Sequence, residues 1–134
     1  MSTDLQMLVY SCLLMIAQSV SLLLASIQAK GGVVPGVMWG VGNRDAAPTL
    51  PAWGDRAIRA HRNMLENLVP FAALVLAAHA AGVSSEETAR GATFFFWGRL
   101  AHAVTYLAGI PYLRTVAFVV ALGGMFDIVR VLLA

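Results

Sequence analysis

The chain has 134 residues, of which 59% are hydrophobic and only 12% are charged. A soluble domain carries about twice that share of charged residues, so the composition excludes an ordinary soluble protein and predicts that lipid covers much of the surface. The net charge of +2 is too small to indicate a nucleic-acid-binding protein. A transmembrane helix needs about 20 apolar residues, so we expect one all-α domain, residues 1–134, folded as a four-helix transmembrane bundle.

The first predicted helix covers residues 5–29, which include no charged residue. No basic segment precedes this run, which is also too long for the apolar part of a typical signal peptide. The only cysteine, Cys12, lies within it, so an internal disulfide is excluded and a buried structural thiol is expected. Polar groups in hydrocarbon should face other helices. Four such residues lie near one face of this helix: Ser11, Gln18, Ser21 and Gln28.

The second predicted helix covers residues 56–82 and follows a loop, residues 30–56, that is rich in glycine and proline. Asp55 is the expected N-cap of this helix. Pro70 lies inside the helical pattern and should kink the helix without ending it, because neighbouring groups can satisfy the freed carbonyl. Gly82 marks the end of the helix.

The third and fourth predicted helices cover residues 86–110 and 113–133. Ser84 and Ser85, followed by Glu86 and Glu87, resemble the start of the third helix. Pro111 should end that helix. The fourth helix carries small residues that allow close helix packing: Ala121, Gly123 and Gly124. Asp127 and Arg130 lie near its far end, where we expect a solvated interface.

Basic residues are distributed unevenly between the two sides of the bundle, which predicts its orientation. Arg90 and Arg130 belong to one side. Six basic residues belong to the other side: Lys30, Arg44, Arg56, Arg59, Arg62 and Arg114. We therefore expect both termini to lie outside the cytoplasm and the first and third loops to lie inside it.

A polar stripe runs along the second predicted helix. Its four members are spaced i, i+3, i+4 and i+7, which places them on one face: Arg59, Arg62, Asn63 and Glu66. An apolar run follows from Leu68, so the stripe should lie close to the membrane boundary, where ionisable residues are costly and usually functional. The alternative is a solvated helix extension with ordinary surface ion pairs.

The third predicted helix carries Arg99, His102 and Tyr106 on one face, in clearly apolar surroundings. An arginine in that position needs an anionic partner or a ligand, and Glu66 is the expected protein partner. The alternatives are a structural salt bridge for Arg99 and a hydrogen-bonded structural role for His102. No histidine pair has metal-ligand spacing with a supporting carboxylate, so we predict no metal site.

Helix polarity places Arg114 and Thr115, at the start of the fourth helix, on the same side as the arginines of the second helix. Arginine grips carboxylates with two parallel hydrogen bonds, so the combined set suits a small ligand with more than one carboxylate. Glutathione would fit, with its carboxylates on arginines and its amine on Glu66, but these residues alone do not select it over other small dianions. A nearby guanidinium would also favour its thiolate.

Two segments carry a resemblance to a known family: RAHRNMLENLVPF at residues 59–71 and GRLAHAVTYLAGIPYLRT at residues 98–115. Together with the helix layout, they make nearly the whole chain resemble the MAPEG family, the membrane-associated proteins in eicosanoid and glutathione metabolism. The segment WGVGNRDAAPTLP, residues 39–51, looks like a large prokaryotic branch of that family whose members are mostly of undefined activity.

The resemblance implies a homotrimer in a bacterial inner membrane, with sites between subunits that take up glutathione from the cytoplasmic side. It implies that Arg114 activates the thiol, and Thr115 stands where some members have a serine. The segment between Tyr106 and Arg114 is about one residue shorter than in prostaglandin-synthesising members. The residues that match glutathione-binding positions of the family are Arg59, Arg62, Asn63, Glu66, Arg99, His102 and Tyr106.

The resulting functional prediction is a microsomal-type glutathione transferase or peroxidase, with glutathione as co-substrate and a lipophilic electrophile that arrives from the bilayer. The alternative is a non-enzymatic lipid-binding protein or an accessory subunit of a larger membrane complex, because one member of the family binds lipid and assists a partner. A small transporter is disfavoured, since the chain has neither an inverted repeat nor a pair of broken helices.

Overall fold

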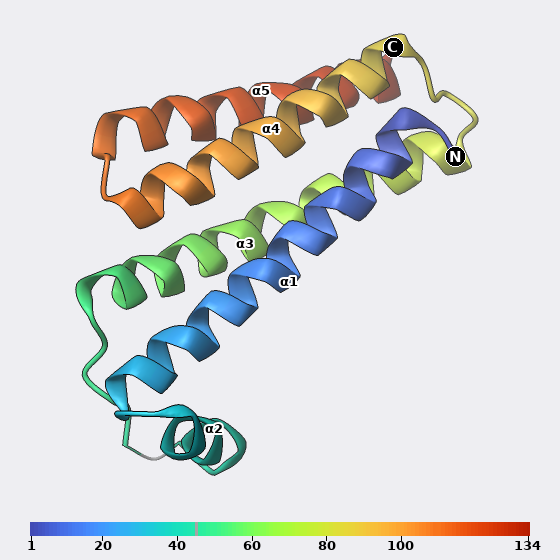
Figure 1. The fold of residues 1–134 in the computed structure, drawn as a ribbon. Helices are drawn as coiled ribbons and strands as arrows, with labels where there is room; N and C mark the ends of the chain where they lie inside the picture. Colours follow the sequence, from blue (N-terminus) through green and yellow to red (C-terminus); the bar gives the residue numbers. More distant parts are fainter. Residues whose placement is uncertain (45) are drawn as a thin grey trace.

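The computed structural model describes residues 1–44 and 46–134, and regular structure in those residues is entirely helical. In Figure 1, α1 runs beside α3 and α4 runs beside α5, and the short α2 lies at the end of α1. The all-α prediction is confirmed. The helices are α1 (Thr3–Ala29), α2 (Val33–Val41), α3 (Ala52–Ala80), α4 (Glu86–Ala108) and α5 (Pro111–Leu133).

Three of these helices, α1, α3 and α5, are long and apolar enough to cross a membrane. The fourth long helix, α4, is as long as α5 but contains Glu86, Glu87, Arg90 and Arg99, which lower its hydropathy. The protein is therefore a membrane protein with several apolar helices. A count of four spans, the homotrimer and the orientation of the termini stay predictions.

The segment predicted as a loop between the first two long helices contains the additional helix α2. Glycine and proline did not prevent a helix here, because Pro35 stands in the first turn, where its nitrogen needs no helical hydrogen bond. The predicted start of α3 was also wrong. Pro51 is the N-cap, and Asp55 lies in the first turn, where its carboxylate interacts favourably with the helix dipole.

The boundary between α4 and α5 also differs from the sequence prediction. α4 ends at Ala108, and Gly109 closes it in the left-handed region with φ of 79°. Pro111, predicted to end the third long helix, is the first residue of α5. Proline is favoured at that position because its ring fixes a helical φ and the first helical N–H has no partner. At the N-terminal end of α4, the side chains of Ser85 and Thr88 each accept a hydrogen bond from the other residue's backbone N–H, which forms a capping box.

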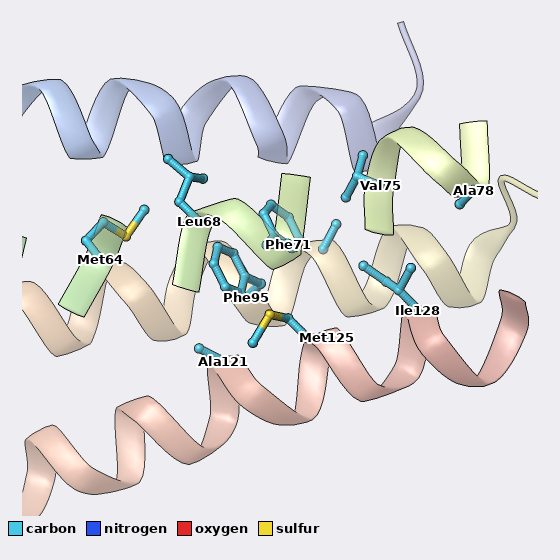
Figure 2. Close-up of a cluster of buried hydrophobic side chains, with 10 residues drawn as sticks. Met64, Leu68, Phe71, Val75, Ala78, Phe95, Ala121, Met125 and Ile128 are labelled. Carbon is cyan, nitrogen blue, oxygen red and sulfur yellow. The ribbon is translucent and has the colours of Figure 1, made fainter. Parts of the chain in front are cut away.

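The core lies between α3, α4 and α5, and α1 packs against it. Figure 2 shows the rings of Phe71 and Phe95 side by side at its centre, and they stack with centroids 3.7 Å apart. Around them lie other buried apolar side chains: Met64, Leu68, Val75, Ala78, Ala92, Ala121, Met125 and Ile128. This core fixes the relative positions of the three helices whose ends carry the predicted polar stripes.

The contact between α4 and α5 depends on glycine. A Cβ atom at Gly91 would lie 2.6 Å from the carbonyl oxygen of Gly124, and one at Gly98 would lie 2.8 Å from the backbone nitrogen of Ala121. Both distances are shorter than a Cβ atom can approach a non-bonded atom, so a side chain at either glycine would force the helices to move. The predicted packing patch is therefore confirmed at Ala121 and Gly124, whereas Gly123 has no neighbour within 4 Å of an added Cβ.

This geometry predicts opposite outcomes for two glycine substitutions. Gly98→Ala should lower the free energy of unfolding by about 1–3 kcal/mol, because the methyl group collides with the backbone of α5 and forces the helices apart. Gly123→Ala, the control on the facing helix, should leave stability unchanged or raise it, because it gains helix propensity without a collision. Thermal unfolding in mild detergent measures both variants, and equal melting temperatures would contradict the prediction.

The prediction that the polar stripe of α1 faces the protein is confirmed at Ser11 and Gln18, whereas Gln28 at the end of the stripe is exposed. Ser11 and Gln18 are buried, and Gln28 accepts a hydrogen bond from the indole nitrogen of Trp53 at 2.9 Å. The prediction of a buried thiol was wrong, since Cys12 is exposed in the single chain. Cys12 follows Ser11 by one residue, a rotation of about 100°, which turns it away from the buried stripe.

Asp4 is a buried polar residue that the sequence analysis did not single out. Its side chain is only 1% exposed. Its carboxylate accepts hydrogen bonds from the hydroxyl of Ser84 at 3.0 Å and the hydroxyl of Thr88 at 3.4 Å. The N-terminal turn of α1 is thereby fixed to the start of α4.

Candidate functional site

A cavity of about 410 Å³ lies between the N-terminal half of α3, the C-terminal half of α4 and the start of α5. Of the nine site residues predicted from the sequence, all except Arg99 line it. The complete lining is Arg59, Arg62, Asn63, Glu66, His102, Tyr106, Arg114, Thr115 and Phe118. The two stripes and the start of α5 therefore meet because the three helix ends lie at one end of the bundle.

On the α3 side of the cavity, Arg62 and Glu66 form an ion pair of 3.3 Å, one turn apart. Their side chains are 80% and 57% exposed, so both remain accessible to a ligand. The expected pair between Glu66 and Arg99 is absent from the described residues. Glu66 points outward and meets the nearer arginine of its own helix, whereas Arg99 points into the bundle.

Arg99 lies beneath the cavity and is 0% exposed. Its Nη2 donates a hydrogen bond of 2.9 Å to the side-chain oxygen of Asn63, and its Nε lies 3.4 Å from the sulfur of Met64. Its Nη1 has no hydrogen-bond partner among the described residues. Arg99 therefore brings a positive charge under the cavity floor and orients Asn63, which itself lines the cavity.

Aromatic side chains shape the α4 and α5 side of the cavity. The guanidinium of Arg114 lies over the ring of Tyr106, 4.3 Å from its centroid, a favourable cation–π arrangement. Tyr106 in turn meets His102 edge to face with centroids 5.3 Å apart. These contacts hold Arg114 at the rim. Phe118 also lines the cavity and was not predicted, although its spacing of four residues from Arg114 places it on the same face of α5.

Charge and shape together suit an anionic ligand. Three arginines and one carboxylate line the cavity, and a fourth arginine lies beneath it. Neighbouring guanidinium groups repel one another, and bound carboxylates would relieve that repulsion through paired hydrogen bonds. Within the described part of the chain, no cluster of three or more His, Cys, Asp or Glu side chains is arranged to hold a metal ion.

The fold and the site together define a class of protein. It is an all-helical membrane protein with an arginine-lined cavity at one end of its helix bundle. The chain belongs to the MAPEG family, whose model matches residues 5–132. This family includes glutathione transferases and related proteins. Searches of curated proteins and of solved structures gave no match.

Proposed function

We propose that the protein binds glutathione in the arginine-lined cavity and transfers it to lipophilic electrophiles or uses it to reduce lipophilic hydroperoxides. The observation that supports this proposal is the convergence of Arg59, Arg62, Glu66 and Arg114 on one cavity. Glutathione has two carboxylates, an amine and a thiol. The arginines of α3 match the carboxylates, Glu66 matches the amine, and Arg114 is left for the thiol.

In the transferase reaction, the thiol of glutathione loses its proton to water and the thiolate sulfur attacks an electrophilic carbon. A carbon–sulfur bond forms, and the electron pair leaves with the displaced group or takes up a proton in an addition. Arg114 would stabilise the thiolate by its positive charge. Phe118 supplies an apolar wall next to it, against which a substrate from the bilayer can pack.

We further propose that the cavity is completed by a second copy of the chain in a homotrimer. The Gln28–Trp53 hydrogen bond sets α1 and α3 side by side, and α1 and α3 run antiparallel, so Arg62 lies near the level of Ser19. Ser19 is ten residues from the end of α1, which is about 15 Å along the helix. An exposed Arg62–Glu66 pair at that depth is costly in lipid, and a neighbouring subunit would cover it.

Isothermal titration of the purified protein with glutathione tests the proposal, together with native mass spectrometry in mild detergent. We expect glutathione to bind and the protein to appear as a trimer. Arg59→Gln should weaken binding at least about tenfold, the effect of losing one charge-assisted contact. Arg90→Gln is the matched control, because Arg90 pairs with Asp127 at the opposite end of the bundle.

Glutarate, a small dianion without an amine or thiol, serves as the comparison ligand. Glutathione should bind at least about tenfold more tightly, since it adds the contact with Glu66. Equal affinities for the two ligands, or equal effects of the Arg59 and Arg90 substitutions, would overturn the assignment of glutathione to this cavity.

A further inference from the structure

A second cavity, of about 550 Å³, lies between the later half of α1, the start of α3 and the segment that follows α2. It shares no residue with the arginine-lined cavity. Its lining is Ser19, Leu22, Leu23, Ser26, Trp39, Gly40, Arg44, Ala47, Pro48, Leu50, Asp55 and Ile58. None of these residues has a part in the function proposed above.

The second cavity has its charged side chains at one end, and the wall further into the bundle is mainly apolar. Asp55 is in the first turn of α3, and Ile58 lies one turn further into the bundle, about 4.5 Å along the axis. On α1, the lining extends from Ser26 inward past Leu23 to Ser19, a distance of about 10 Å. A charged rim above an apolar wall has the polarity of one leaflet of a bilayer.

Arg44 is held in place at the rim of this cavity. Its backbone adopts a φ of 58°, which is uncommon for a residue with a side chain. Its Nε and Nη2 donate hydrogen bonds of 2.9 and 2.7 Å to the carbonyl of Gly40. The guanidinium also lies 5.8 Å from the ring centroid of Trp39, whose indole nitrogen donates to the carbonyl of Ala46 at 2.8 Å. A cation ordered in this way loses little entropy when it binds an anion.

The neighbouring helix α2 has the features of a helix that lies at a membrane surface. Figure 1 shows α2 at the end of α1. Lys30 and Arg44 flank α2 in the sequence, as in helices that lie in the headgroup layer. Five of its large apolar side chains are exposed: Val33, Val34, Val37, Met38 and Val41.

We propose that the second cavity binds one phospholipid whose headgroup carries both a phosphate and a primary ammonium group. The phosphate meets Arg44, the ammonium meets Asp55, and one acyl chain lies along Leu22, Leu23 and Ile58. The described lining contains one cation and one anion, which matches a zwitterion better than an anionic lipid. A primary ammonium donates hydrogen bonds to a carboxylate, whereas a quaternary ammonium has no N–H to donate.

The test uses the full-length protein reconstituted in nanodiscs that contain equal amounts of phosphatidylethanolamine, phosphatidylcholine and phosphatidylglycerol. Native mass spectrometry after release from the disc measures the lipid that stays bound. We expect phosphatidylethanolamine to be retained at least about fivefold over each of the other two. Asp55→Asn should abolish that preference, and Arg44→Gln should reduce all retained phospholipid at least about tenfold.

Matched controls come from the opposite end of the bundle, where Asp127→Asn and Arg130→Gln make the same charge changes in a surface ion-pair cluster. Both should leave lipid retention unchanged. Ile58→Trp fills the cavity from a partly exposed position, so it should expel lipid while helical content by circular dichroism is preserved. Equal retention of the three lipids by the wild type, or unchanged retention in both Arg44→Gln and Ile58→Trp, would overturn the proposal.

Discussion

Arg114→Ala is expected to lower the turnover number for glutathione conjugation at least about tenfold, equivalent to ~1.4 kcal/mol of transition-state stabilisation. The glutathione Kd should change by less than about threefold. The reason is that the proposed function assigns this guanidinium, held over Tyr106 at the cavity rim, to the sulfur and not to the carboxylates. Steady-state kinetics with a soluble aromatic electrophile and titration calorimetry separate the two effects.

Arg62→Ala is the matched comparison, because Arg62 lines the same cavity from α3, the side to which the proposed function assigns the carboxylates. It should weaken glutathione binding more than turnover, since a carboxylate contact is equally strong in the ground state and the transition state. The ultraviolet absorbance of bound thiolate should shift to higher pH in Arg114→Ala and stay in place in Arg62→Ala. The wild-type protein could bind glutathione but show no thiolate absorbance at pH 8 and no turnover of any electrophile. That result would refute the enzymatic function and favour a lipid-binding or accessory role.

Arg99→Met is expected to raise the stability of the ligand-free protein by about 1–3 kcal/mol. The described residues give this buried guanidinium an amide oxygen and a sulfur but no carboxylate. Replacing a buried, poorly compensated charge by an apolar side chain of similar length is often stabilising. The stabilisation that glutathione confers should shrink in the same variant, because the charge beneath the cavity is lost. Thermal unfolding with and without glutathione measures both effects.

Asn63→Leu should act in the opposite direction. It removes the oxygen that accepts the hydrogen bond from Arg99 and leaves the guanidinium buried with one partner fewer. The expected loss is about 1–3 kcal/mol, the cost of an unsatisfied buried polar group. A loss of stability in Arg99→Met as large as that in Asn63→Leu would show that an anion compensates Arg99 in the assembled protein, as the sequence analysis expected of Glu66.

The membership of the arginine-lined cavity was predictable from helical spacing. Arg59 and Glu66 are seven residues apart, and His102 and Tyr106 are four residues apart, so each pair shares a helix face. Short connections between antiparallel helices then bring those faces to one end of the bundle. Spacing did not reveal the partner of Arg99, because the direction of a side chain around a helix depends on how the helices pack. Glu66 is on the predicted helix but faces outward.

The helix α2 was not predicted because its residue types and its membrane surroundings favour different backbone structures. Glycine and proline in the segment VVPGVMWGV indicate a break in regular structure. At a membrane surface, however, a backbone gains more from internal hydrogen bonds than it does in water. The exposed valines of α2 are the visible signal, since an apolar face in a supposed loop indicates contact with lipid.

The hydrogen bonds that Asp4 accepts from Ser84 and Thr88 form late in the synthesis of the protein. Its two partners, Ser84 and Thr88, follow it by 80 and 84 residues. A ribosome makes α1 first, so the carboxylate of Asp4 has only local partners, such as the backbone N–H of Leu5, until the start of α4 has been made. The contact that joins the first turn of α1 to the start of α4 can therefore form only after α3 has been made.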